Sequence, residues 1–194
     1  MPQISSEEFT RLPLRVHDLL AGVPLHDVWA IDLPRVRSGI TLDQFLQAAN
    51  ARSCALPTPV RALVGIRMVI GQRLGWDREP PAEAWKSFAS RLTAPDRSRS
   101  LAPPGTREGL FRVVYRFENE QLLELINRTA HAAALSALFE TANAYRFYFG
   151  VYVRNVSRFT PVYMALIDPF RKLLVYPSIL RDVRAKWNKT FSRA

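Results

Sequence analysis

The C-terminal segment of residues 160–187 constrains the fold most, because its apolar side chains recur every three or four residues. A helix with such a stripe must bury it against another large apolar surface. Thr160 followed by Pro161 predicts the start of this helix, since proline in the first helical turn costs no hydrogen bond. Pro169 and Pro177 interrupt the backbone hydrogen bonds, so we expect one kinked helix or two nearly collinear helices. The stripe comprises Val162, Tyr163, Leu166, Ile167, Phe170, Leu173, Leu174, Ile179, Leu180, Val183 and Trp187.

Residues 144–154 form the clearest predicted strand, and they supply the surface that this helix needs. Every second side chain is apolar, so one face of the strand is suited to pack beneath the terminal helix. The opposite face sets Tyr148 and Tyr152 beside arginines, which resembles either a stacking platform for single-stranded nucleic acid or a solvated outer face. The apolar face carries Tyr145, Phe147, Phe149, Val151 and Val153, and the opposite face carries Arg146, Tyr148, Gly150, Tyr152 and Arg154.

The first 75 residues predict one strand and two helices. Residues 26–33 are rich in β-forming side chains and end at Pro34, which cannot continue a ladder. Thr41 is expected to cap a short helix that follows it. A stronger amphipathic helix is predicted after Pro59, where apolar positions recur at helical spacing as far as Leu74.

The middle of the chain is less regular. Residues 77–107 are rich in proline and predict a long connection with a short helix around Phe88, placed to lie over the mouth of a cavity. Residues 111–117 alternate as a half-exposed strand. Residues 121–139 are ambiguous, because their Ala and Leu content favours a helix while the turn signal before them favours a β-hairpin.

Length and composition indicate one globular unit. A chain of 194 residues can bury a core without a disulfide or a metal, so we expect a single domain over residues 1–194. No apolar run reaches the roughly 20 residues of a membrane span, and the N-terminus lacks an apolar signal segment, which indicates a cytoplasmic protein. Cys54 is the only cysteine and is expected to be a small buried hydrophobe.

Positive charge is concentrated towards the C-terminus. The formal net charge is +10, and residues 146–194 carry ten Lys and Arg against two acids, Asp168 and Asp182, a balance of +8. Such a segment suits an anionic membrane surface, an acidic ligand or, least favoured, nucleic acid; otherwise it is the solvated face of a basic protein. A peripheral position at the inner membrane face is therefore a further expectation.

Several short stretches resemble a known family. They are VWA at 28–30, LGWD at 74–77, INRTAH at 126–131, VYVR at 151–154, YMALIDPFR at 163–171 and LVYP at 174–177. Together they resemble the bacterial domain-of-unknown-function family 2867, which is generally placed among the SRPBCC or START-like helix-grip proteins. The resemblance implies an α+β fold in which a curved antiparallel sheet wraps around a long kinked C-terminal helix. It also implies that residues 121–139 form strand.

No strong catalytic or metal-binding signature is present in the sequence. His131, Arg128 and Glu124 are the candidate catalytic residues; a strand over 121–139 would carry them together with the polar residues Asn127 and Thr129. That strand would place His131 on one face and Glu124 with Arg128 on the other. His131 is then either a general acid or base or a structural histidine, and Arg128 either binds an anionic group or forms a surface ion pair with Glu124.

These observations lead to one favoured function and two alternatives. The favoured one is a binding module that holds a hydrophobic or amphipathic, lipid-like or polyketide-like small molecule between sheet and helix, with no cofactor and no metal. The first alternative is a cyclase, dehydratase or hydrolase in the same cavity, and the second is binding of an anionic surface or nucleic acid through the basic C-terminal segment. The expected cavity residues are Tyr145, Phe147, Phe149, Val151, Tyr163, Leu166, Phe170 and Leu174.

Overall fold

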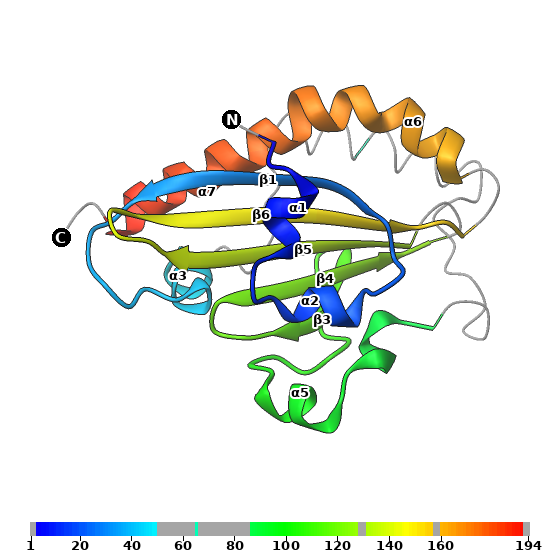
Figure 1. Cartoon of the computed structure of the whole chain (residues 1–194), viewed down its shortest axis with the longest axis horizontal. Coiled ribbons are helices and arrows are strands. Elements are labelled where there is room, and N and C mark those ends of the chain that lie inside the picture. The colour runs from blue at the N-terminus through cyan, green and yellow to red at the C-terminus, as the bar shows by residue number, and fades with distance from the viewer. Residues whose placement is uncertain (1–2, 50–64, 66–85, 128–130, 157–159, 192–194) are drawn as a thin grey trace.

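The computed structural model describes residues 3–49, 65, 86–127, 131–156 and 160–191, which form an α+β fold (Figure 1). Its centre is an antiparallel, curved six-stranded sheet in the order β1-β6-β5-β4-β3-β2. The strands are β1 (Leu25–Pro34), β2 (Arg107–Glu108), β3 (Phe111–Arg116), β4 (Glu120–Ile126), β5 (His131–Glu140) and β6 (Ala144–Arg154). The N-terminal strand therefore pairs with the last one and forms an edge of the sheet.

Helices lie on both sides of this sheet (Figure 1). The short ones are α1 (Ser6–Thr10), α2 (Arg15–Leu19), α3 (Leu42–Ala48), the 3₁₀ helix η1 (Phe88–Arg91) and α5 (Ala94–Arg99). The long C-terminal helix consists of α6 (Thr160–Phe170), a π-helical turn η2 (Arg171–Val175) and α7 (Tyr176–Phe191). None of the helices in the described ranges is long and apolar enough to cross a membrane.

The sequence-based strands agree with the structure. The predicted strands over 26–33, 111–117 and 144–154 are confirmed as β1, β3 and β6. Segment 121–139 forms strand, as the resemblance implied, but it contributes to two strands, β4 and β5. Strand β3 is not half-exposed, because its residues from Val113 onwards are all buried. Its register shifts between Val113 and Tyr115, and the consecutive residues Val114 and Tyr115 belong to one core cluster.

The sequence-based helices agree in part. Thr41 caps α3 through a capping box with Gln44, as its position predicted. The long connection contains η1 near the predicted short helix and also α5, which was not predicted. The helix predicted after Pro59 lies outside the described residues, apart from Gly65.

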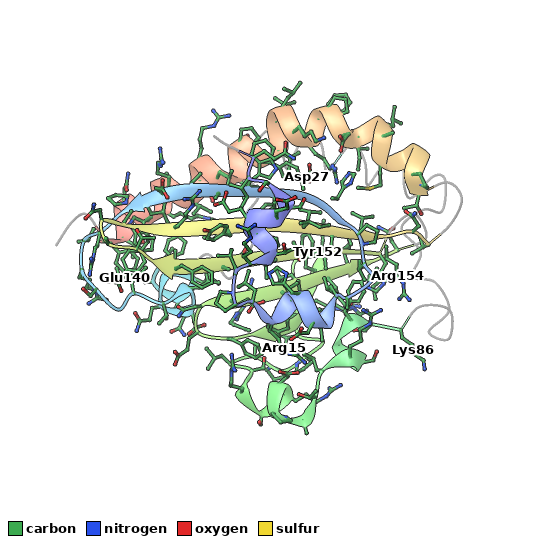
Figure 2. The ribbon with its side chains drawn as sticks, viewed as in Figure 1. Arg15, Asp27, Lys86, Glu140, Tyr152 and Arg154 are labelled. Atoms are coloured by element: carbon green, nitrogen blue, oxygen red, sulfur yellow. The ribbon has the colours of Figure 1, made fainter. Side chains whose placement is uncertain are left out.

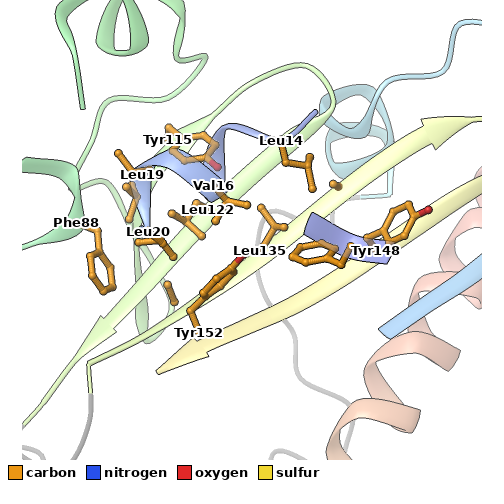
Figure 3. Close-up of a cluster of buried hydrophobic side chains, with 14 of the residues drawn as sticks. Leu14, Val16, Leu19, Leu20, Phe88, Tyr115, Leu122, Leu135, Tyr148 and Tyr152 are labelled. Carbon is orange, nitrogen blue, oxygen red and sulfur yellow. The ribbon is translucent and has the colours of Figure 1, made fainter. Parts of the chain in front are cut away.

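Helices α1 and α2 cover the sheet face that carries Tyr148 and Tyr152 (Figure 3). Both tyrosines are only 5% exposed, in a cluster with Phe9, Val16 and other apolar side chains. Gly150 between them lies directly under Phe9, since a Cβ there would be 3.4 Å from the ring, which is van der Waals contact. The predicted stacking platform is therefore wrong, because the N-terminal helices bury the rings that it requires.

Helix α7 covers part of the opposite face of the sheet. Trp187 is fully buried there against Phe45 and Tyr145, and its indole N–H donates a hydrogen bond of 2.9 Å to the Pro34 carbonyl. Leu180 is also fully buried in this cluster. The C-terminal half of the terminal helix is thus anchored on β1 and α3 by apolar contacts.

The N-terminal half of the terminal helix departs from the predicted burial. Leu166, Phe170, Leu173 and Leu174 are 68%, 52%, 74% and 44% exposed, although the sequence stripe predicted them to be buried. The side of α6 that faces the sheet instead carries Met164 and Ile167. Apolar residues occupy two sides of this part of the helix, and only one side can face the sheet.

Candidate functional site

Part of the sheet face beneath the terminal helix is only half-buried, although it lies on the interior strands β4, β5 and β6. On the other face of the same strands, residues such as Ala133 and Leu135 have no exposed surface. Their sequence neighbours Ala132, Ala134 and Ser136, which face the terminal helix, are all intermediate in exposure, although β5 is not an edge strand. The described residues therefore leave this surface incompletely covered. We call it the floor; it consists of Leu123, Leu125, Ala132, Ala134, Ser136, Phe149 and Val151.

A buried carboxylate, Asp27, lies beside the floor, because it pairs with Val151 across β1 and β6 (Figure 2). Its side chain is 1% exposed. It accepts hydrogen bonds from Arg171 at 3.0 Å and from the Tyr176 hydroxyl at 3.2 Å. Burial raises the pKa of Tyr176, which keeps the phenol protonated as a donor. Strand β1 is thereby tied to the π-helical turn and to the start of α7.

A second carboxylate, Asp168, extends this group towards solvent. Its oxygens lie 2.5 Å from Arg171, 2.7 Å from Lys172 and 3.2 Å from His26. Burial alone would raise the pKa of Asp168, but hydrogen bonds from Lys172 and Arg171 outweigh it and lower the pKa to about 2. The pKa of Lys172 is raised, chiefly by its hydrogen bond to Asp168. We call His26, Asp27, Asp168, Arg171, Lys172 and Tyr176 the Asp27 cluster.

Two irregularities of the backbone assemble the Asp27 cluster. The register of β1 against β6 shifts between Leu25 and Asp27, which re-aims the side chains at this end of the strand. The π-helical turn then inserts an extra residue into the terminal helix, where Pro177 already cannot donate an amide hydrogen to the preceding turn. Such turns are frequent at functional sites.

Three buried polar atoms at this site have no hydrogen-bond partner within the described part of the chain. They are Asp27 Oδ1, Trp29 Nε1 and Arg171 Nε. The Trp29 ring lies 5.7 Å from the Tyr176 ring between centroids, and the Arg171 guanidinium lies 5.6 Å from the same ring. Asp27 Oδ1 keeps an ion-pair partner, Lys172 Nζ, at 3.8 Å, whereas no partner within the described residues compensates the two donors. Leaving a buried donor unpaired costs about 1–3 kcal/mol, so the site is equipped to bind a polar group.

The Asp27 cluster fits a metal ion poorly. Atoms of His26, Asp27 and Asp168 lie within 4.8 Å of one another, which is a spacing that a metal could use. Arg171 and Lys172 already neutralise both carboxylates, however, and a cation would have to displace them. The charges suit a polar organic group better than a divalent ion.

Two of the predicted catalytic residues do come together, but on the other side of the sheet. His131 Nε2 lies 3.1 Å from Glu124, and both side chains are almost completely buried. The prediction that they occupy opposite faces is wrong, because the chain reverses between β4 and β5 and Ile126 pairs with His131. Arg128 lies outside the described residues.

Glu124 and His131 have the features of a structural pair. Glu124 also accepts hydrogen bonds from the Ser87 hydroxyl and from the Phe88 amide, at 2.9 Å for the latter. Burial would raise the pKa of Glu124, but hydrogen bonds from His131, Ser87 and Phe88 outweigh it and lower the pKa. A carboxylate with a lowered pKa and both oxygens occupied is poorly suited to remove a proton. The Phe88 ring stacks on the His131 ring, with 3.8 Å between the centroids, and covers one face of the imidazole.

Two surface pockets lie on the same side of the sheet as this pair. One, of about 290 Å³, is lined by Ser87, Arg97, Arg112, Glu124 and neighbouring residues. The other, of about 600 Å³, lies near Leu14, Phe117 and Phe139. Neither lies between the sheet and the terminal helix, where the sequence predicted the binding site. Their lining mixes charged and polar side chains with apolar ones.

The residues predicted to line a sheet–helix cavity lie in different parts of the structure. Tyr145 and Phe147 are buried in the contact with α7, whereas Phe149 and Val151 belong to the floor. Leu166, Phe170 and Leu174 are exposed on the far side of the terminal helix. The Tyr163 side chain is not among the described ones.

Sequence reasoning missed most of the Asp27 cluster as a functional group. A signal was available, since Asp27 is an acid next to the apolar run Val28–Ile31, and Asp168 and Arg171 lie on either side of Pro169, which interrupts the helix. Periodicity alone could not connect them, because β1 and η2 are far apart in the sequence.

The described residues therefore define an α+β protein with a half-buried floor and an adjoining buried charge cluster. The family model described as Protein of unknown function (DUF2867) matches residues 19–178, and the chain belongs to this family. No curated protein and no solved structure matches the chain.

The pKa of Asp168 predicts a pH-dependent contribution to stability. The folded pKa of about 2 lies below the ordinary 3.8, so the carboxylate stabilises the fold above about pH 4, and this contribution is lost towards about pH 2. Asp168→Asn should lower the free energy of unfolding by about 2 kcal/mol near neutral pH and by less as the pH falls. Urea unfolding between about pH 7 and about pH 3 measures this difference.

The matched control is Asp182→Asn, which breaks only the surface pair with Lys186 and should cost at most about 1 kcal/mol. A difference between wild type and Asp168→Asn that stays constant across this pH range would contradict the role of the carboxylate.

Glu124→Ala tests whether the Glu124–His131 pair stabilises the fold. It leaves three buried donors without an acceptor, so the free energy of unfolding should fall by about 3–5 kcal/mol. Glu118→Ala at an exposed position nearby should change it by about 0.5 kcal/mol or less. If chemical denaturation gives equal values for both variants, Glu124 does not hold this part of the fold together.

Proposed function

We propose that this protein is a binding module for an amphipathic small molecule. The apolar part of the ligand lies on the floor, and its polar group lies at the Asp27 cluster. The observation that carries the proposal is the half-buried floor on interior strands, which adjoins three buried polar atoms that make no hydrogen bond within the described residues. Apolar surface next to a few fixed polar groups is typical of small-molecule sites.

The unpartnered atoms suggest the chemistry of the polar group. Trp29 Nε1 and Arg171 Nε are donors, so the ligand must offer acceptor oxygens, as a carboxylate or a carbonyl does. Asp27 Oδ1 is an acceptor and would receive a ligand hydroxyl. A lipid-like or polyketide-like acid with an oxygen-bearing end and a hydrocarbon body meets these requirements.

The proposal also includes a helix-grip fold and a cytoplasmic location for the protein. An antiparallel sheet with a long, π-interrupted C-terminal helix across one face supports a helix-grip (START-like) fold. A cytoplasmic location is part of the proposal and agrees with the absence of a membrane-spanning helix from the described ranges.

The alternative of a cyclase, dehydratase or hydrolase has less support. It relied on His131, Arg128 and Glu124 in the same cavity as the ligand. Glu124 and His131 lie on the opposite face of the sheet from the floor, and all the oxygens of Glu124 are engaged. Binding therefore explains more of the observations than catalysis.

Fluorescence titration with anilinonaphthalene sulfonate, and its displacement by palmitate, test the proposal. Ala134→Trp fills the floor and should weaken binding of both compounds about tenfold or more. Trp29→Phe removes one donor but keeps an aromatic ring, so it should weaken palmitate binding about fivefold. Native mass spectrometry of the purified protein should also detect a retained amphipathic molecule.

The control variant is Ala185→Trp, which adds the same ring at an exposed position of α7 and should leave binding unchanged. Thermal melting of each variant confirms that it is folded. Binding to folded Ala134→Trp with wild-type affinity would refute the proposed location.

A further inference from the structure

The solvent side of the terminal helix is divided lengthwise into an apolar part and a basic part. In α6 and η2, the exposed residues whose side chains are described are all apolar. The large ones are Leu166, Phe170, Leu173 and Leu174, which we call the apolar ridge. They recur at spacings of three and four residues, so they form one contiguous strip about 12 Å long. A contiguous exposed strip of this kind marks an interaction surface.

The basic part follows the apolar part along the helix into α7. Arg181, Arg184 and Lys189 are exposed there, and the exposed residues between them, Ala185 and Asn188, carry no charge. Figure 1 shows that α6 and α7 follow one another as a single, gently curved rod along the β1 edge of the sheet. One elongated surface therefore offers hydrocarbon at one end and positive charge at the other.

The charges nearest to the apolar ridge are already neutralised. Lys172 pairs with Asp168 at 2.7 Å, and Arg171 pairs with Asp27 and Asp168. These residues flank the ridge without adding net charge to it, so the ridge can enter an apolar environment at little electrostatic cost.

We propose that this surface docks the protein onto an anionic lipid bilayer, with the apolar ridge in the interface and Arg181, Arg184 and Lys189 at the headgroups. Helices that lie in a bilayer interface combine an apolar face with basic residues in this manner. A second copy of the chain is a poorer occupant, because it carries the same basic segment and a net charge of +10. An anionic bilayer offers both the apolar interior and the opposite charge.

Docking goes beyond ligand binding and does not depend on it. If both occur, the Asp27 cluster, which adjoins η2, lies close to the bilayer from which an amphipathic molecule would enter. A variant that loses docking can therefore still bind anilinonaphthalene sulfonate, and this distinguishes failure of one proposal from failure of the other.

Co-sedimentation with vesicles tests the docking. The full chain is mixed with vesicles of phosphatidylcholine alone or with about one-third phosphatidylglycerol. The expected result is binding to the anionic vesicles at least about tenfold tighter than to the neutral ones. Arg181→Ala and Arg184→Ala should each weaken anionic binding about fivefold. Phe170→Ser with Leu173→Ser should weaken it about tenfold or more, because both side chains would leave the hydrocarbon.

Leu110→Ser is the matched control, since Leu110 is 44% exposed on a part of the surface remote in sequence from the terminal helix. It should leave vesicle binding unchanged. The proposal is overturned if the ridge variant binds as the wild type does, if neutral and anionic vesicles bind equally, or if no vesicle binds. Light scattering that shows a dimer dissociated by Phe170→Ser with Leu173→Ser, without vesicle binding, would assign the ridge to a second copy instead.

Discussion

The ion pair between Asp27 and Arg171 is the interaction on which the rest of the site depends. It joins the edge strand to the π-helical turn, and its side chains are only 1% and 12% exposed. A buried pair of this kind contributes little net stability, because desolvation offsets the attraction, yet the loss of one partner is costly. Its effect is geometric, since it fixes how the terminal helix crosses the sheet next to the floor.

The two faces of the sheet have different roles. The side under α1 and α2 is stabilised by apolar packing and by the Glu124–His131 pair, and its two pockets lie at the surface. The side under the terminal helix combines a firm anchor at Trp187 with a half-buried floor further along. Stability and proposed function thus come from different faces of the same strands, which alternate side chains between them.

Local sequence patterns were sufficient for most of the strands but not for the site. Alternation identified β1, β3 and β6, and the capping signal at Thr41 identified the start of α3, because these depend on near neighbours. Burial of the terminal helix was mispredicted at Leu166 and Phe170, since apolar spacing does not reveal which of two apolar sides meets the sheet. The Asp27 cluster could not be predicted, because it requires a register shift in β1 and a π-helical turn to meet in space.

An amphipathic ligand, as proposed, places its polar group at the Asp27 cluster. The most direct test is the tryptophan indole N–H region of a nitrogen–proton correlation spectrum during titration with palmitate. The Trp29 indole N–H lacks a partner within the described residues, so its signal should shift as it donates to the ligand. The Trp187 signal, whose N–H is bonded to the Pro34 carbonyl, should stay in place. Saturable binding of palmitate with no change at Trp29 would contradict the claim.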